Sequence, residues 1–147
     1  MTESAAIIQY LSETFANSKE LYLPNDARSR ATLSEWCYFI FSELDAASLY
    51  VVRRHEGLKH FYGEAPVAVE SAKDYLLHNL AAMASRVVSD GPYLFGDRLS
   101  TADVLLMTCL YWATAIEVLL SDTVLHYRER LRQRPAYNAA FKRNFAQ

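Results

Sequence analysis

The chain has 147 residues, of which 52% are hydrophobic and 22% are charged, and its net charge is −2. This length suits one domain with a single core, and the composition excludes an intrinsically disordered protein. A charge this close to zero gives no electrostatic basis for binding nucleic acid.

The spacing of apolar residues predicts an all-α fold. We expect helices over about 4–15, 26–55, 66–89, 101–119 and 122–133, and a short final helix after Pro135. Asn25 is expected to cap the second of these helices, and Gly57 to end it. The turn residues of "DGPYLFGD", 90–97, predict a loop, and no segment alternates as a strand would.

The positions of the cysteines and of the charged residues indicate in which cellular compartment the protein is expected. Cys37 and Cys109 lie in apolar helical stretches, which is typical of reduced thiols in a cytoplasmic protein. Glu3 interrupts any apolar run at the start, so no signal peptide is expected. The uncharged stretch 104–116 is too short to cross a bilayer and suits a buried helix, so we expect no membrane partner.

The second expected helix is too apolar for a single buried face. Leu33, Trp36, Ile40 and others form one apolar stripe, yet "WCYFIF", 36–41, is apolar through more than a full turn. Tyr38 and Phe41 must therefore meet something beyond that stripe. The helix is either central and packed on two sides, or it contributes a dimer contact or a ligand pocket.

An acid, Asp103, stands at the start of the uncharged stretch, three residues after Ser100. In such a pair the serine oxygen accepts from the backbone N–H of residue 103, and the carboxylate accepts from that of residue 100. We interpret the pair as a structural capping box that opens a buried helix. The alternative is a catalytic acid or a metal ligand.

Three other motifs predict no site. His55 and His60 are five residues apart, so they point to different sides of a helix and cannot share a metal ion. The arginines at 128, 130, 132 and 134 surround a helix and favour a solvated face. "GPYLFGD" lacks the lysine that a phosphate-binding loop needs.

The segment "PYLFGDRLSTADVLL" resembles the glutathione S-transferase family, whose C-terminal helical domain has a Ser/Thr-x-x-Asp box that opens a core helix. "TESAAIIQYLSE" resembles the last helix of that family's thioredoxin-like N-terminal domain, and "LYLPNDARSRA" resembles its interdomain linker. "RQRPAYNAAF" resembles the closing segment. "TLSEWCYFIFSEL" and "TCLYWA" are most similar to bacterial beta-class members.

The resemblance implies a division of the chain and a set of site residues. Residues 1–18 would be the remnant of the thioredoxin-like domain, 19–30 the linker and 31–147 the helical domain. Glu3 and Ser4 would hold the γ-glutamyl end of glutathione, although an N-cap and a first-turn acid explain the same pair. The expected pocket or interface residues are Trp36, Tyr38, Ile40, Phe41 and Trp112.

The chain departs from the family pattern in two places. Family members carry further residues before the position of Glu3, including the catalytic Cys, Ser or Tyr, so no catalytic residue is expected in this chain. Asp45-Ala46 stands where beta-class members often have His-Lys.

Two functional hypotheses follow from this sequence. The first is the helical half of a homodimeric transferase that joins glutathione to a small hydrophobic electrophile without a metal. The alternative is a non-catalytic helical binding or assembly module.

Overall fold

The computed structural model describes residues 1–15, 21–87 and 91–145, and within these ranges the chain is helical and has no β-strand. This confirms the all-α prediction. The elements in chain order are α1 (Ser4–Phe15), α2 (Ala27–Phe39), η1 (Ile40–Leu49), α3 (Tyr50–Val52), η2 (Arg53–Gly57), α4 (Lys59–Tyr62), α5 (Pro66–Val87), α6 (Thr101–Ala115), α7 (Asp122–Arg132) and α8 (Pro135–Phe145).

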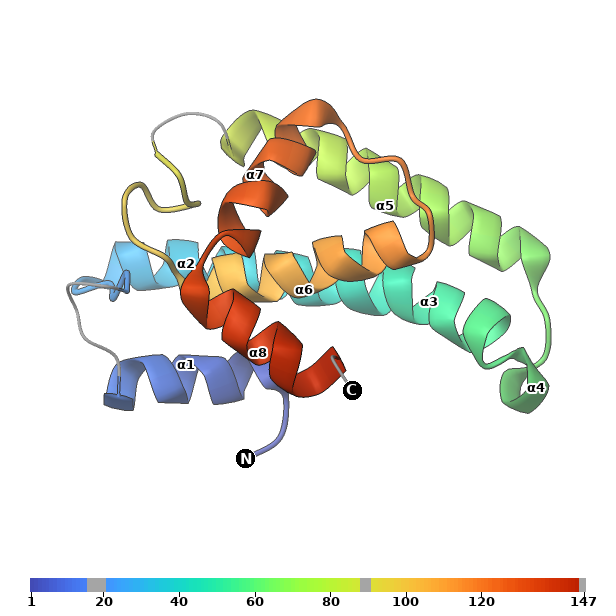
Figure 1. Cartoon of the computed structure of the whole chain (residues 1–147), viewed down its shortest axis with the longest axis horizontal. Coiled ribbons are helices and arrows are strands. Elements are labelled where there is room, and N and C mark those ends of the chain that lie inside the picture. Colours follow the sequence, from blue (N-terminus) through green and yellow to red (C-terminus); the bar gives the residue numbers. More distant parts are fainter. Residues whose placement is uncertain (16–20, 88–90, 146–147) are drawn as a thin grey trace.

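The elements α2, η1, α3 and η2 form one continuous rod, called the long helix below (Figure 1). Its N-cap is Asp26 and not Asn25, because Asp26 Oδ1 accepts a 2.9 Å hydrogen bond from the backbone N–H of Ser29. The rod ends at Gly57, as expected. Its segments η1 and η2 are π-helical, with wider turns than an α-helix.

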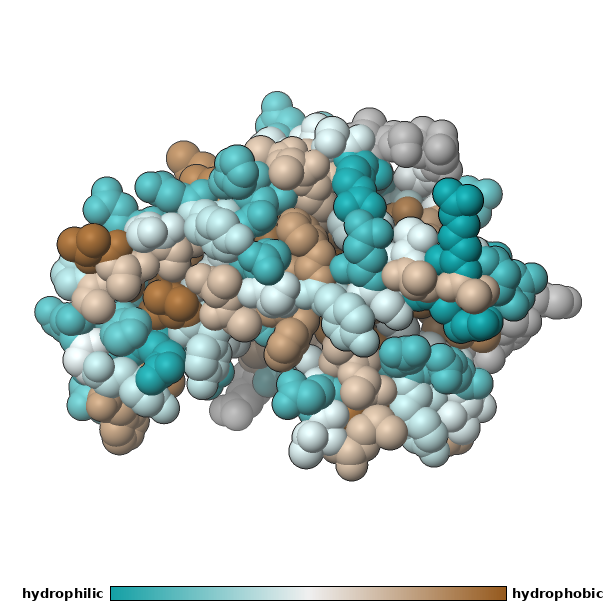
Figure 2. All heavy atoms as spheres, turned by 180° about the vertical axis from the view of Figure 1, so that it is seen from behind, coloured by the Kyte–Doolittle hydropathy of each residue, from teal (hydrophilic) through white to brown (hydrophobic). Residues whose placement is uncertain are grey.

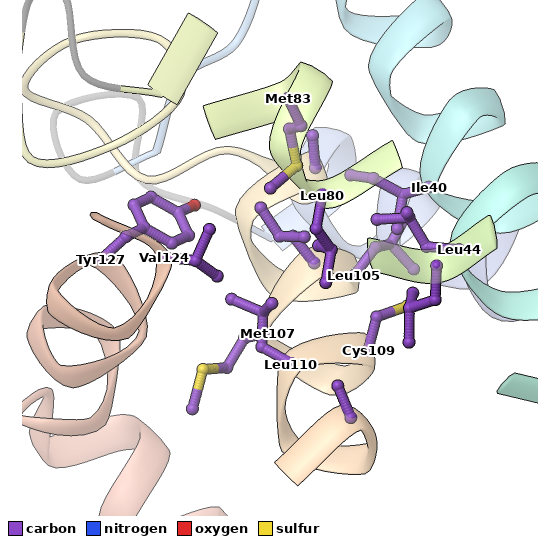
Figure 3. Close-up of a cluster of buried hydrophobic side chains, with 14 of the residues drawn as sticks. Ile40, Leu44, Leu80, Met83, Leu105, Met107, Cys109, Leu110, Val124 and Tyr127 are labelled. Carbon is purple, nitrogen blue, oxygen red and sulfur yellow. The ribbon is translucent and has the colours of Figure 1, made fainter. Parts of the chain in front are cut away.

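Helix α6 lies at the centre of the molecule (Figure 1). It contacts the long helix, α1 and α7, while α5 packs along the long helix. Nine of its fifteen residues are buried, which explains why this stretch carries no charge after Asp103. In the core, α6 residues such as Leu110 meet Leu44 of η1, Leu80 of α5 and Val124 of α7 (Figure 3).

The helix at α6 is shorter than the sequence predicted. It ends at Ala115 instead of about 119, and Glu117 adopts a left-handed conformation with φ of 60°. The backbone N–H of Val118 then donates to the carbonyl of Ala113 over 2.9 Å, which closes the last turn. The expected end of the 66–89 helix lies outside the described residues.

A buried network fixes the start of α6. Asp103 Oδ2 accepts from the Ser100 backbone N–H at 2.7 Å, and Ser100 Oγ accepts from the Asp103 N–H at 3.3 Å. Asp103 Oδ1 also accepts from the Leu94 N–H at 2.9 Å and from the Tyr127 hydroxyl. The capping box therefore joins the loop before α6, the helix itself and α7.

No helix in the described part of the chain is long and apolar enough to cross a membrane. Both cysteines are free thiols, with Cys109 buried and Cys37 half-buried.

Candidate functional site

A cavity of about 300 Å³ opens between α1, the long helix and α6, and is called the α1–α6 cavity below. Three elements that are distant in sequence contribute to it. Its lining residues are Ser4 and Ile8 of α1, Ile40, Phe41, Asp45, Leu49, Tyr50 and Arg53 of the long helix, and Leu105, Thr108, Cys109 and Trp112 of α6.

Several of the expected site residues lie together in this cavity. Ile40, Phe41 and Trp112 form part of its apolar wall, and Ser4 lies at its edge in the first turn of α1. Glu3 precedes that turn, is exposed and does not line the cavity. Its backbone has a positive φ of 64°, and its carbonyl accepts from the Ile7 N–H at 3.0 Å, so residue 3 begins the helix.

Trp36 and Tyr38 lie elsewhere. Trp36 is buried in the core, where the Arg86 guanidinium lies 4.4 Å from the centre of its ring and Phe39 meets it edge-on. Tyr38 is 69% exposed on the outer side of the long helix. The apolar run 36–41 therefore contributes Trp36 to the core, Ile40 and Phe41 to the cavity wall, and Tyr38 to the outer surface.

Two charged residues of the cavity, Asp45 and Arg53, were not among the expected site residues. The Arg53 guanidinium lies 5.3 Å from the centre of the Trp112 ring. Burial raises the pKa of the Asp45 carboxyl, and the positive charge of Arg53 partly opposes this. The sequence offered two signals for Asp45: it stands where the family resemblance places a polar pair, and it lies four residues after Phe41, on a similar side of the helix.

The cavity also contains a thiol. Burial, with a further contribution from the charge of Asp45, raises the pKa of Cys109 to about 12. Burial likewise raises the pKa of the Cys37 thiol. Thiols of this kind stay protonated at neutral pH, and a protonated thiol is a poor nucleophile.

A second cavity of about 380 Å³ lies between α6 and α8 and is called the α6–α8 groove. Its walls are largely apolar and include several aromatic residues, and Tyr111 of α6 meets Phe141 and Phe145 of α8 with ring centres 5.9 and 5.4 Å apart. Thr108 and Trp112 line both this groove and the α1–α6 cavity. The two cavities are therefore neighbours on either side of α6.

The two histidines of the motif "HEGLKH" make separate contacts in this fold. His55 Nδ1 lies 3.0 Å from the Gly63 carbonyl oxygen, and the His60 ring lies tilted at 45° to the Phe61 ring. In the described ranges no group of three or more His, Cys, Asp or Glu is placed to hold a metal ion.

Comparison with known proteins identifies the family. Residues 39–142 match the family model for the C-terminal domain of glutathione S-transferase. The chain is 26% identical over 138 residues to the glutathione S-transferase GstA of Escherichia coli O157:H7, a match that covers 92% of this chain and 63% of GstA.

Solved structures agree with this result. A glutathione transferase from Methylococcus capsulatus is 32% identical, with a TM-score of 0.79 over 97% of this chain and 67% of that protein. BphK, a bacterial GST solved as a ternary complex, has the same fold at 24% identity, with a TM-score of 0.82 over 97% of this chain and 68% of BphK. The match to the C-terminal domain model covers most of the chain, and the chain therefore belongs to the glutathione S-transferase family.

Proposed function

We propose that this chain is the helical half of a beta-class-like glutathione S-transferase, and that its α1–α6 cavity binds a small hydrophobic electrophile. One observation carries the proposal. Ser4, the position that resembles a glutathione contact, lines the same cavity as the aromatic residues Phe41 and Trp112. A glutathione held at the start of α1 would therefore lie beside an apolar space that suits its reaction partner.

The proposed role of Glu3 and Ser4 is to bind the γ-glutamyl end of glutathione. The first turn of a helix offers backbone N–H groups for a carboxylate, and side-chain oxygens nearby can accept from an α-amino group. Both residues are exposed, so they are free to meet a ligand. Glutathione is the co-substrate in this scheme, and no metal takes part.

The reaction would be the attack of the glutathione thiolate on the electrophile, a detoxifying conjugation. That step needs a group that lowers the pKa of the glutathione thiol. Among the described residues both cysteines have raised thiol pKa values, so neither thiol is suited to this task. We therefore propose that residues 1–147 alone do not conjugate, and that a thioredoxin-like half supplies the catalytic residue.

The proposed organisation follows the same resemblance. Residues 1–18 would belong to the thioredoxin-like half, 19–30 to the linker and 31–147 to the helical domain. The backbone N–H of Tyr22 donates to the Leu99 carbonyl at 2.8 Å, which is consistent with a linker that lies along the helical domain. Two free thiols are consistent with a reducing compartment, and we place the protein in the cytoplasm.

The proposal includes a homodimer. Tyr38 of the long helix and Tyr75 and Leu77 of α5 are exposed apolar residues on two elements that pack against each other. On the face seen from behind in Figure 2, apolar residues are scattered among hydrophilic ones. We propose that the exposed residues near Tyr38 contribute to the dimer contact.

Activity assays test the transferase proposal. The chain should be compared with the same chain joined to the thioredoxin-like half of a relative, using glutathione and 1-chloro-2,4-dinitrobenzene. The joined protein should conjugate, and the chain alone should stay at the background rate. In the joined protein Glu3→Ala should raise the KM for glutathione, and Trp112→Ala should raise the KM for the electrophile. Turnover by the chain alone would overthrow this assignment.

A second candidate function is a non-catalytic helical binding module. The α6–α8 groove favours it, because an aromatic cavity of about 380 Å³ is large enough for a small apolar ligand. The same assay separates the two. A joined protein that binds glutathione but never conjugates would favour the module.

A further inference from the structure

Asp45 is an unpaired acid in the wall of an apolar cavity. It is the only acidic side chain among the described residues that line the α1–α6 cavity, and it is half-buried. Within the described part of the chain its carboxylate forms no hydrogen bond and no ion pair, although its backbone carbonyl accepts from the Tyr50 N–H. Its neighbours along the cavity wall include Phe41, Leu49 and Trp112. The carboxylate oxygens therefore keep their acceptor capacity for whatever fills the cavity.

Arg53 does not remove this capacity. It forms no ion pair with Asp45, since no nitrogen of Arg53 comes within 4.0 Å of the carboxylate oxygens. Its guanidinium lies instead over the Trp112 ring at 5.3 Å, and the residue is exposed. Its charge acts on Asp45 at longer range, opposing the effect of burial.

The negative charge of Asp45 also reaches the interior of the cavity. It contributes to the raised pKa of the Cys109 thiol, which lines the α6 wall. The Thr108 hydroxyl on the same wall already has a hydrogen-bond partner, because Thr108 Oγ1 donates to the Val104 carbonyl at 3.2 Å. None of these protein groups donates a hydrogen bond to the Asp45 carboxylate, which therefore remains open to solvent.

A ligand that enters the cavity displaces the water around this carboxylate. A purely apolar ligand leaves the acceptor without a partner, which costs free energy, whereas a ligand with a suitably placed N–H or O–H restores the hydrogen bond. A site built around a buried polar group rejects analogues that lack the matching group more strongly than an apolar pocket rejects a size change. Asp45 therefore has the means to select among electrophiles.

We propose that the electrophile bound in the α1–α6 cavity carries an N–H or O–H donor beside its apolar body, and that Asp45 is the residue that selects it. This inference rests on the proposed function, because it names the substrate class of the same cavity. It assigns Asp45 a role in specificity and none in the bond-forming step.

A matched pair of probes tests the inference on the 147-residue chain. 2-Naphthalenemethanol has a hydroxyl donor, and its methyl ether keeps the ring and the oxygen but lacks the donor. Titration of each into ¹⁵N-labelled protein follows the indole N–H signal of Trp112, with buried Trp36 as the internal reference. Trp112→Phe assigns the signal. The alcohol should bind roughly tenfold more tightly than the ether, as expected for one hydrogen bond to a charged group.

Substitutions at Asp45 should alter this selectivity. In Asp45→Leu the ether should bind more tightly and the alcohol more weakly, so that the ratio of their affinities approaches one. Asp45→Asn keeps the shape of the side chain without its charge, and should retain a smaller preference. Asp74→Leu, a matched control at an exposed aspartate of α5, should leave the preference unchanged.

The outcomes separate this inference from the proposed function. Equal affinities for the two probes, a ratio that both Asp45 variants leave unchanged, or binding of neither probe would overturn the inference. If the joined protein conjugates while the probes bind equally, only the inference fails. If the probes are discriminated and the joined protein does not conjugate, the transferase proposal fails, while the donor selectivity of Asp45 in the cavity stands.

Discussion

At the scale of single residues, Asp103 connects more of the structure than any capping role requires. Its two oxygens accept from the backbone of Ser100 and Leu94 and from the Tyr127 hydroxyl, and it is fully buried. Burial and the charge of Asp103 raise the pKa of Tyr127 well above its usual range, so the hydroxyl remains a donor. The sequence predicted the box with Ser100. It could not predict Leu94 or Tyr127, because those contacts arise only when the loop and α7 fold onto α6.

The Asp103 network predicts unequal effects of substitution. Ser100→Ala should lower the free energy of unfolding by about 1 kcal/mol, the usual cost of a lost N-cap. Asp103→Ala should cost about 3 kcal/mol or more, because four buried or partly buried donors lose their acceptor. The double variant should fall short of the sum, since the two side chains serve one box. Urea denaturation measures all three, and equal, additive effects would contradict the network.

The thiol of Cys109 predicts a dependence of stability on pH. Its pKa is raised from 9.0 to about 12, so the folded state keeps the proton after the unfolded state has lost it. The stabilising contribution is complete below about pH 9 and is lost as the pH rises toward 12. From about pH 8 to 10.5, Cys109→Ala should therefore lose about 1 to 2 kcal/mol less stability than the wild type. Urea denaturation of the wild type and of Cys109→Ala at both pH values measures this difference in stability. If the two proteins lose the same stability between these pH values, the expectation is wrong.

At the scale of elements, apolar spacing together with the prolines, glycines and capping residues predicted the main helices, whereas the short α4 was not expected. The long helix contains π-helical turns that no residue type signals, although Ser48 Oγ supports one by donating to the Glu43 carbonyl at 2.6 Å. Helix α6 ends at Ala115 without a glycine, and Glu117 takes the left-handed conformation after it, which the sequence did not predict. The site was harder to predict, since Trp36 and Phe41 look alike in sequence and only packing decides which one is buried and which one lines a cavity.

The loop before α6 is tight enough to require glycine. A Cβ added at Gly91 would lie 2.6 Å from the carbonyl carbon of Gly96. Gly91→Ala should therefore displace the loop that brings Leu94 to Asp103, and should cost about 2 kcal/mol of stability, in the range of an overpacked site. Gly57→Ala is the control, because a Cβ there meets nothing within 4 Å. Thermal denaturation compares the two, and a harmless Gly91→Ala would show that the loop adapts.

At the scale of the whole molecule, apolar side chains are exposed on more than one side. Ile7, Leu11 and Phe15 are exposed on α1, Tyr38 is exposed on the long helix, and the α6–α8 groove is open. Within the described part of the chain, no other element covers these side chains. Residual apolar surface of this kind favours association.

We expect the chain to self-associate, with the Tyr38 face contributing to the contact. Tyr38→Glu should shift the equilibrium toward monomer, because a charge placed at an apolar interface loses its hydration. Phe61→Glu is the matched control, since Phe61 is similarly exposed but belongs to α4 at the end of the molecule. Sedimentation velocity at high micromolar concentration measures both variants. A monomeric wild type, or an equal effect of Phe61→Glu, would refute the proposed contact.

The central position of α6 has a consequence for the order of synthesis. The ribosome releases the long helix and α5 before α6, yet Leu44 and Leu80 complete their packing only against α6 residues such as Leu110. A nascent chain that has reached Ser100 therefore exposes the apolar stripes of two finished helices. A fragment that ends there should be helical by circular dichroism without a cooperative melting transition. The packing of the two earlier helices thus depends on α6, which is synthesised after both of them.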